Sequence, residues 1–153
     1  MTILNLTRPI VFIDIETTGL DARDGHRILE ICLIKINPDG TEETLSSLIN
    51  PAMQIPIEAT KIHGITNDDV RGKPTFNEFA RKIIEFIGNC DLGGFGTKFD
   101  LGFLESEFKR TGIKYSEEER YVIDVQRIFH TLEPRDLSAA HLRYCGKPLE
   151  KAH

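Results

Sequence analysis

The stretch Ile10-Val11-Phe12-Ile13-Asp14-Ile15-Glu16-Thr17-Thr18-Gly19-Leu20 decides the fold of this 153-residue chain. It begins as an apolar, β-branched run, which is typical of a strand buried on both faces. Because side chains alternate along a strand, Asp14 and Glu16 point to the same side, and Thr17-Thr18-Gly19 ends the strand in a turn. Two adjacent carboxylates repel each other and lose hydration unless protons or cations offset their charge. The pair therefore indicates a site for divalent cations such as Mg²⁺, which prefer oxygen ligands. The alternative is that one acid caps the turn while the other faces water.

The bulk properties of the chain predict one soluble domain with a core of its own. Lys and Arg number 19 and Asp and Glu number 24, so the net charge is 19 − 24 = −5. That balance excludes a protein that coats nucleic acid by bulk charge, so any grip on nucleic acid must be local or supplied by metals. The sequence has neither a run of roughly 18 apolar residues nor a signal peptide, which predicts a cytoplasmic protein without a membrane partner.

The cysteines, Cys32, Cys90 and Cys145, lie far apart, which argues against a disulfide framework or a zinc site. Cys32 sits within an apolar strand pattern, so we expect it in the core.

Strands and helices alternate along the rest of the chain. The first strand is expected at about 9–16, and a hairpin of strands 27–36 and 41–49 turns at Asn37-Pro38-Asp39-Gly40. The further predicted segments are helix-like pieces over 57–66 and 66–70, helices over 75–87, 98–110, 124–132 and 137–144, and strands over 90–95 and 121–123. This order is typical of an α/β sheet with an antiparallel half and a parallel half. Residues 150–153 resemble the opening turn of another helix.

Asp100 stands in the first turn of the predicted helix 98–110, directly after a strand. An acid there stabilises the helix dipole, which is the structural reading. The functional reading is that the strands 9–16 and 90–95 are parallel neighbours, so that Asp100 joins Asp14 and Glu16 at their carboxyl ends. The turn Gly93-Gly94-Phe95-Gly96 fits neither phosphate-loop pattern. We interpret it as backbone that needs room, for instance for a substrate to pass.

Four motifs occur in a fixed order along the chain, namely Asp14-Ile15-Glu16-Thr17-Thr18-Gly19-Leu20, His63-Gly64-Ile65-Thr66, Phe99-Asp100-x-x-Phe103-Leu104 and Ala152-His153. With them the chain resembles the DEDDh family of 3′–5′ exonucleases, most of all its proofreading members that work with bacterial DNA polymerase III. The resemblance implies a ribonuclease H-like fold, with a five-stranded mixed sheet flanked by helices. It also implies one exonuclease domain over 1–153, whose last helix and fourth acid would follow His153.

The resemblance also implies roles for individual residues. Asp14, Glu16 and Asp100 would bind two divalent cations, Mg²⁺ or Mn²⁺, and His153 would be the general base. The residues that would line the site of the 3′-terminal nucleotide are Thr17, Leu20, His63 and Phe99. The chain departs from the family at Phe95 and Gly96, where a polar group that helps to hold the DNA strand is replaced.

The expected function is metal-dependent hydrolysis of phosphodiester bonds at 3′ ends of single-stranded DNA, with a DNA polymerase subunit as the protein partner. One alternative is an exoribonuclease that acts on short RNA, because discrimination at the 2′-OH depends on pocket geometry. The other is an exonuclease-like module that binds metal and DNA ends, or a polymerase, without cutting, because the fourth acid is absent from this sequence.

Overall fold

The computed structural model describes residues 5–149. The expectations for His153 and for a helical turn over 150–153 fall outside this range. The described elements are β1 (Ile10–Thr17), η1 (Ala22–Asp24), β2 (Ile28–Ile36), β3 (Glu42–Leu48), α1 (Ile57–His63), α2 (Phe76–Ile87), β4 (Asp91–Gly94), α3 (Thr97–Thr111), β5 (Val122–Asp124), α4 (Val125–Leu132) and α5 (Leu137–Cys145).

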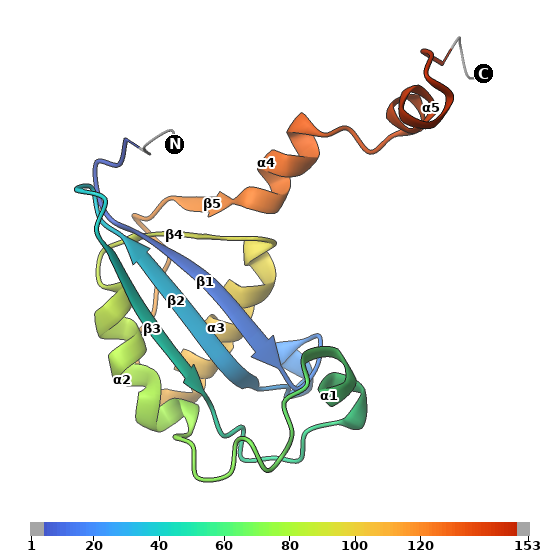
Figure 1. Cartoon of the computed structure of the whole chain (residues 1–153). Coiled ribbons are helices and arrows are strands. Elements are labelled where there is room, and N and C mark those ends of the chain that lie inside the picture. The colour runs from blue at the N-terminus through green and yellow to red at the C-terminus, as the bar shows by residue number, and fades with distance from the viewer. Residues whose placement is uncertain (1–4, 150–153) are drawn as a thin grey trace.

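The strands form one five-stranded sheet in the order β3-β2-β1-β4-β5 (Figure 1). β2 is antiparallel to both β1 and β3, whereas β4 is parallel to β1 and to β5. The predicted mixed sheet is therefore confirmed, with its antiparallel half first along the chain. Because β1 and β4 are parallel neighbours, their carboxyl ends meet at one edge, as the functional reading of Asp100 requires.

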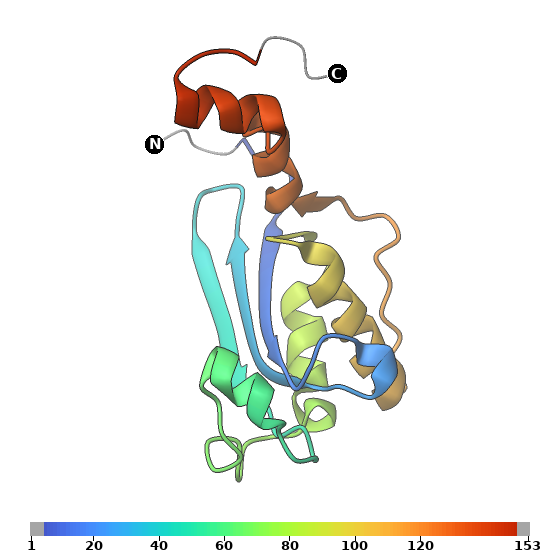
Figure 2. The same cartoon turned by 90° about the vertical axis from the view of Figure 1, so that its right-hand side faces the viewer.

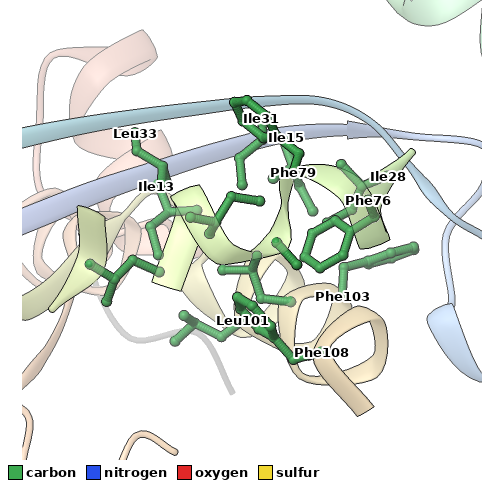
Figure 3. Packing of buried hydrophobic residues seen from close by; sticks show 14 of the residues in the cluster. Ile13, Ile15, Ile28, Ile31, Leu33, Phe76, Phe79, Leu101, Phe103 and Phe108 are labelled. Carbon is green, nitrogen blue, oxygen red and sulfur yellow. The ribbon is translucent and has the colours of Figure 1, made fainter. Parts of the chain in front are cut away.

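The helices α2 and α3 cover one face of the sheet (Figures 2 and 3). The main core lies between this face of the sheet and the two helices. β1 and β2 supply alternate residues to it, and the helices supply their apolar stripes. The labelled core residues in Figure 3 are Ile13, Ile15, Ile28, Ile31, Leu33, Phe76, Phe79, Leu101, Phe103 and Phe108. The expectation that Cys32 is in this core is wrong, because Ile31 and Leu33 point to the helices and Cys32, between them, points to the other face.

Three of the five described α-helices, namely α2, α4 and α5, begin with a side-chain cap, and the cap of α5 is Asp136. Thr75 and Glu78 form a reciprocal capping box at α2, and Asp124 caps α4 by accepting from the N–H groups of Gln126 and Arg127. Thr97 is the first residue of α3, and Gly96 caps this helix with a φ of 81° and no side-chain bond. Residues 66–70, expected to begin a helical turn, form turns only.

The glycines of β4 need room for a different reason from the one expected. A Cβ on Gly93 would lie 2.8 Å from the ring of Phe12, and one on Gly94 would lie 2.9 Å from the carbonyl oxygen of Ile13. β1 itself therefore fills the space beside these two glycines, and the expectation of a passage for substrate at this turn is wrong for Gly93 and Gly94.

After α3, the chain continues through β5 into α4 and α5, which extend away from the body of the sheet (Figures 1 and 2). None of the helices within residues 5–149 is long and apolar enough to cross a membrane.

Candidate active site

β1 presents two carboxylates on the face opposite the helices. Ile13 and Ile15 are buried in the core, so Asp14 and Glu16, which alternate with them, project from the other face. Asp14 is exposed and lies opposite Cys32 of β2, whereas Glu16 is half-buried and lies opposite Glu30. The alternation predicted from the sequence is thus confirmed in the strand.

Asp100 lies in the first turn of α3, and only 6% of its surface is exposed. Burial, with a smaller contribution from the negative charge of Asp14, raises the pKa of Asp100 to about 6, although backbone N–H groups of Asp100 and Ile15 oppose the change. A helix dipole alone would lower this pKa. The upward shift of the pKa therefore follows mainly from the burial of the carboxyl, and the charge of Asp14 contributes to it.

Glu16 lies between Asp14 and the end of α1. Partial burial raises the pKa of Glu16, His63 opposes the rise, and the charges of Asp14 and Glu30 add to it. The Nδ1 atom of His63 accepts a hydrogen bond of 3.0 Å from the backbone N–H of Ile65, which leaves Nε2 as the protonated donor. That Nε2 atom is buried and has no hydrogen-bond partner within residues 5–149. His63 therefore offers an unused donor beside Glu16.

The donor set fits divalent cations. None of the ion pairs formed by the described residues involves Asp14, Glu16 or Asp100. Mutually repelling carboxylates without a cationic side chain, one of them the buried Asp100, have the chemistry that hard cations require. The described part of the chain contains no group of three or more His, Cys, Asp or Glu side chains already close enough to hold a metal ion. Binding of a metal ion by all three carboxylates would therefore require them to move closer together.

A pocket of about 490 Å³ opens directly beside Glu16. Its lining includes all of the predicted nucleotide-site residues, which are Thr17, Leu20, His63 and Phe99. Leu20 is 83% exposed and Phe99 is 38% exposed, so both present apolar surface to the pocket. Thr17 differs from the expectation in one respect: its hydroxyl donates to the carbonyl of Gly19 at 2.7 Å, so it shapes the turn.

The pocket also contains residues that the sequence did not indicate. His26 lies on its wall and shares a hydrogen bond of 3.1 Å with Thr18 Oγ1, although its surroundings in the sequence suggest a solvated side chain. Ile62 of α1 is 81% exposed and lines the same pocket. The sequence offers one signal for Ile62, which is an apolar residue outside the buried face of a short helix. It offers no signal that would place His26 against Gly19.

A second cavity, of about 750 Å³, shares Leu20, Asp21 and Phe99 with the first. It extends along α3 to Gly96 and Gln126. Asp124, the cap of α4, connects the start of α4 to the start of α3, because its carboxylate accepts a hydrogen bond of 3.0 Å from the backbone N–H of Gly96. Hydrogen bonds from this N–H and from those of α4 lower the pKa of Asp124, which keeps the cap ionised.

Residues 11–145 match the exonuclease family (RNase T type). The DNA polymerase III subunit epsilon of Rickettsia typhi is 40% identical over 111 residues, which are 70% of this chain and 48% of that protein. The subunit epsilon of Buchnera aphidicola subsp. Schizaphis graminum is 34% identical over 151 residues, 92% of this chain and 65% of that protein. The chain thus spans between about half and two thirds of the length of these curated relatives.

The fold is also that of solved exonuclease structures. Exonuclease I of E. coli in complex with a dA16 oligonucleotide superposes with a TM-score of 0.70 at 20% identity, over 84% of this chain and 31% of that one. This likeness confirms the ribonuclease H-like fold expected from the sequence. With the family match covering residues 11–145, the chain belongs to the exonuclease family.

Proposed function

We propose that this protein is a metal-dependent 3′–5′ exonuclease that releases mononucleotides from single-stranded DNA ends. The observation that carries the proposal is the buried Asp100, whose pKa Asp14 helps to raise, at the edge of the sheet where Glu16 borders a pocket. The relatives' names agree with it, since epsilon subunits belong to DNA polymerase III and exonuclease I is solved with oligonucleotides. By the same analogy, a DNA polymerase subunit is the proposed protein partner and the cytoplasm the proposed location.

Asp14, Glu16 and Asp100 would hold two Mg²⁺ or Mn²⁺ ions. When bound, such ions stabilise the charge that develops on the attacking and leaving oxygens of a phosphodiester. Three carboxylates carry −3 and two divalent ions carry +4, so the loaded site would attract a phosphate. The carboxylates of this chain would therefore act by holding the charge of the ions in place.

The pocket would hold the 3′-terminal nucleotide. Its volume of about 490 Å³ lies in the range of about 300–1,000 Å³ of small-molecule sites. The partly exposed ring of Phe99 offers a surface on which a base can stack, and Leu20 offers a second apolar contact. The free Nε2–H of His63 would donate to an oxygen of the sugar or phosphate. His153 remains the proposed general base that takes the proton of the attacking water.

The test is digestion of a 5′-labelled single-stranded DNA oligomer with Mn²⁺, with EDTA as the metal-free control. We expect shortening from the 3′ end, and we expect the Asp14→Ala variant to leave the oligomer intact. A matched RNA oligomer in the same assay separates a deoxyribonuclease from the exoribonuclease alternative. If the labelled strands stay intact with wild-type protein and Mn²⁺, the proposed activity is wrong and a non-cutting binding module is favoured.

A further inference from the structure

A buried ion cluster lies behind the pocket, on the core side of α3. Glu107 is 1% exposed, yet it is a charged side chain. Its carboxylate accepts from Arg27 Nε at 2.7 Å and Nη2 at 3.0 Å, and Arg110 Nη1 lies 3.3 Å away. We call Arg27, Glu107 and Arg110 the Glu107 cluster. Because burying charges loses hydration that their attraction only partly offsets, stability alone is a weak reason for such a cluster.

The two arginines of the cluster hold the segment 18–27, which connects β1 to β2. Arg110 Nη2 donates to the carbonyl of Ala22 at 2.9 Å, and Nη1 donates to that of His26 at 3.4 Å. The ends of the segment are joined as well, since the N–H of Thr18 donates to the carbonyl of Arg27 at 2.9 Å. The N–H of Arg27 in turn donates to Thr18 Oγ1 at 2.9 Å. Segment 18–27 is thus closed on itself and attached to α3 through Arg27 and Arg110.

Segment 18–27 forms one wall of the pocket beside Glu16. Leu20, Asp21, Asp24 and His26 all line that pocket. The His26 ring sits so close over Gly19 that a Cβ there would lie 2.3 Å from a ring atom. A shift of His26 or of its carbonyl would therefore change the shape of the wall that the terminal nucleotide would touch.

A second part of the pocket lining comes from the first turn of α3, at the end of the helix away from Glu107. Phe99 and Asp100 lie in the first turn of α3, and Glu107 follows Asp100 by seven residues, which is about two turns. Asp100 and Glu107 are both buried, as expected for residues on one helix face. α3 thus carries Phe99 at one end and the attachment of segment 18–27 at the other, so the helix fixes the separation of these two parts of the lining.

We infer that Arg27, Glu107 and Arg110 are positioning residues that hold Leu20 and His26 at the correct distance from Phe99 for the terminal nucleotide. The inference rests on the proposed function. The cluster sets nucleotide affinity and not metal affinity, because its bonds reach segment 18–27 and not the side chains of Asp14 and Glu16. Weakening the cluster should loosen the nucleotide pocket while the metal site keeps its ligands.

The test uses the p-nitrophenyl ester of thymidine 5′-monophosphate, a substrate with a single nucleotide that can occupy only this pocket. In Glu107→Gln we expect KM to rise about tenfold with kcat changed less than about twofold. The variant loses binding energy that the substrate and the transition state share equally, and such a loss raises KM and leaves kcat unchanged. The Mn²⁺ concentration at half-maximal rate should be unchanged. Arg110→Ala keeps the Arg27–Glu107 pair but removes both bonds to Ala22 and His26, and it should raise KM in the same way.

A matched control separates positioning from general stability. Phe76→Leu weakens the core through the Phe76–Phe108 contact, where the ring centroids are 5.3 Å apart, and it removes none of the hydrogen bonds of the Glu107 cluster. Compared well below its melting temperature, this variant should keep the wild-type KM. Calorimetric affinity for dTMP in Ca²⁺ gives the same comparison without turnover, and we expect about tenfold weaker binding in Glu107→Gln and Arg110→Ala.

The outcomes distinguish the two proposals. A wild-type protein that binds dTMP but does not hydrolyse the ester contradicts the proposed activity only, and the dTMP affinities of the variants then decide the positioning role. An unchanged KM and dTMP affinity in Arg110→Ala overturns the positioning role. So does a rise in KM of equal size in Phe76→Leu. A wild-type protein that neither binds dTMP nor hydrolyses the ester overturns both.

Discussion

Replacing Asp100 by Asn should make the metal-free protein more stable at neutral pH. The Asp100 carboxyl is 6% exposed and lies beside Asp14, and its pKa is raised from 3.8 to about 6. Because the folded state then binds the proton more tightly than the unfolded state does, stability from this group is full below about pH 4 and is lost as pH rises through about 6. A shift of about two units at about 1.4 kcal/mol per unit corresponds to about 3 kcal/mol.

The Asp100→Asn variant carries no charge at this position, so it should not show this loss. In EDTA, its free energy of unfolding at pH 7.5 should exceed that of the wild type by up to about 3 kcal/mol, and the two should converge near pH 4. With Mg²⁺, the difference in the free energy of unfolding between the two proteins should become smaller or change sign. The reason is that a ligand that binds only the folded wild type stabilises it by mass action.

The assay is urea unfolding followed by circular dichroism between pH 4 and pH 8, in EDTA and in Mg²⁺. Glu42→Gln, at an exposed position of β3, is the matched control for the loss of one negative charge. The reasoning is refuted if Asp100→Asn is less stable than the wild type in EDTA at pH 7.5. It is also refuted if the difference between the two proteins does not change between pH 4 and pH 7.

Three further predictions follow from the same geometry. Asp14→Ala should abolish Mg²⁺ binding and activity at little cost in metal-free stability, because it relieves repulsion with Glu16 and Asp100. Thermal melting with and without Mg²⁺ measures this effect. A large loss of stability in the metal-free variant would make Asp14 a structural residue. Mg²⁺ affinity measured by calorimetry should fall as pH drops below about 6, because protons compete with the metal for Asp100, and an affinity independent of pH would contradict this. Thr75→Ala should lower the free energy of unfolding by about 1 kcal/mol, since it removes the capping box of α2, and an unchanged urea midpoint would show that the cap contributes nothing.

The parts of the fold that depend on local pattern could be predicted from the sequence. Alternation along β1 is enough to place Asp14 and Glu16 on one face, and the stripe and cap of α2 follow from Phe76 to Ile87 and Thr75. Asp100 could be placed at the same edge of the sheet because parallel neighbouring strands end at one edge. These are short-range rules combined with one topological rule.

The parts that depend on contacts between distant segments could not be predicted. Cys32 looked apolar in its strand, but its face was decided by which side α2 and α3 cover. The need for Gly93 came from the ring of Phe12 on the neighbouring strand, and the place of His26 came from its packing over Gly19. The Glu107 cluster joins positions 27 and 107, and no periodicity within α3 distinguishes Glu107 from an exposed acid.

The central claim is that Asp14, Glu16 and Asp100 form one site for divalent cations. The most direct measurement is a crystal structure of the protein soaked in Mn²⁺, with anomalous scattering recorded at the manganese edge. We expect a manganese peak within about 2.5 Å of carboxylate oxygens of both Asp14 and Asp100, bordering the pocket beside Glu16. Manganese bound elsewhere, with the Asp100 carboxylate directed away from Asp14, would contradict it.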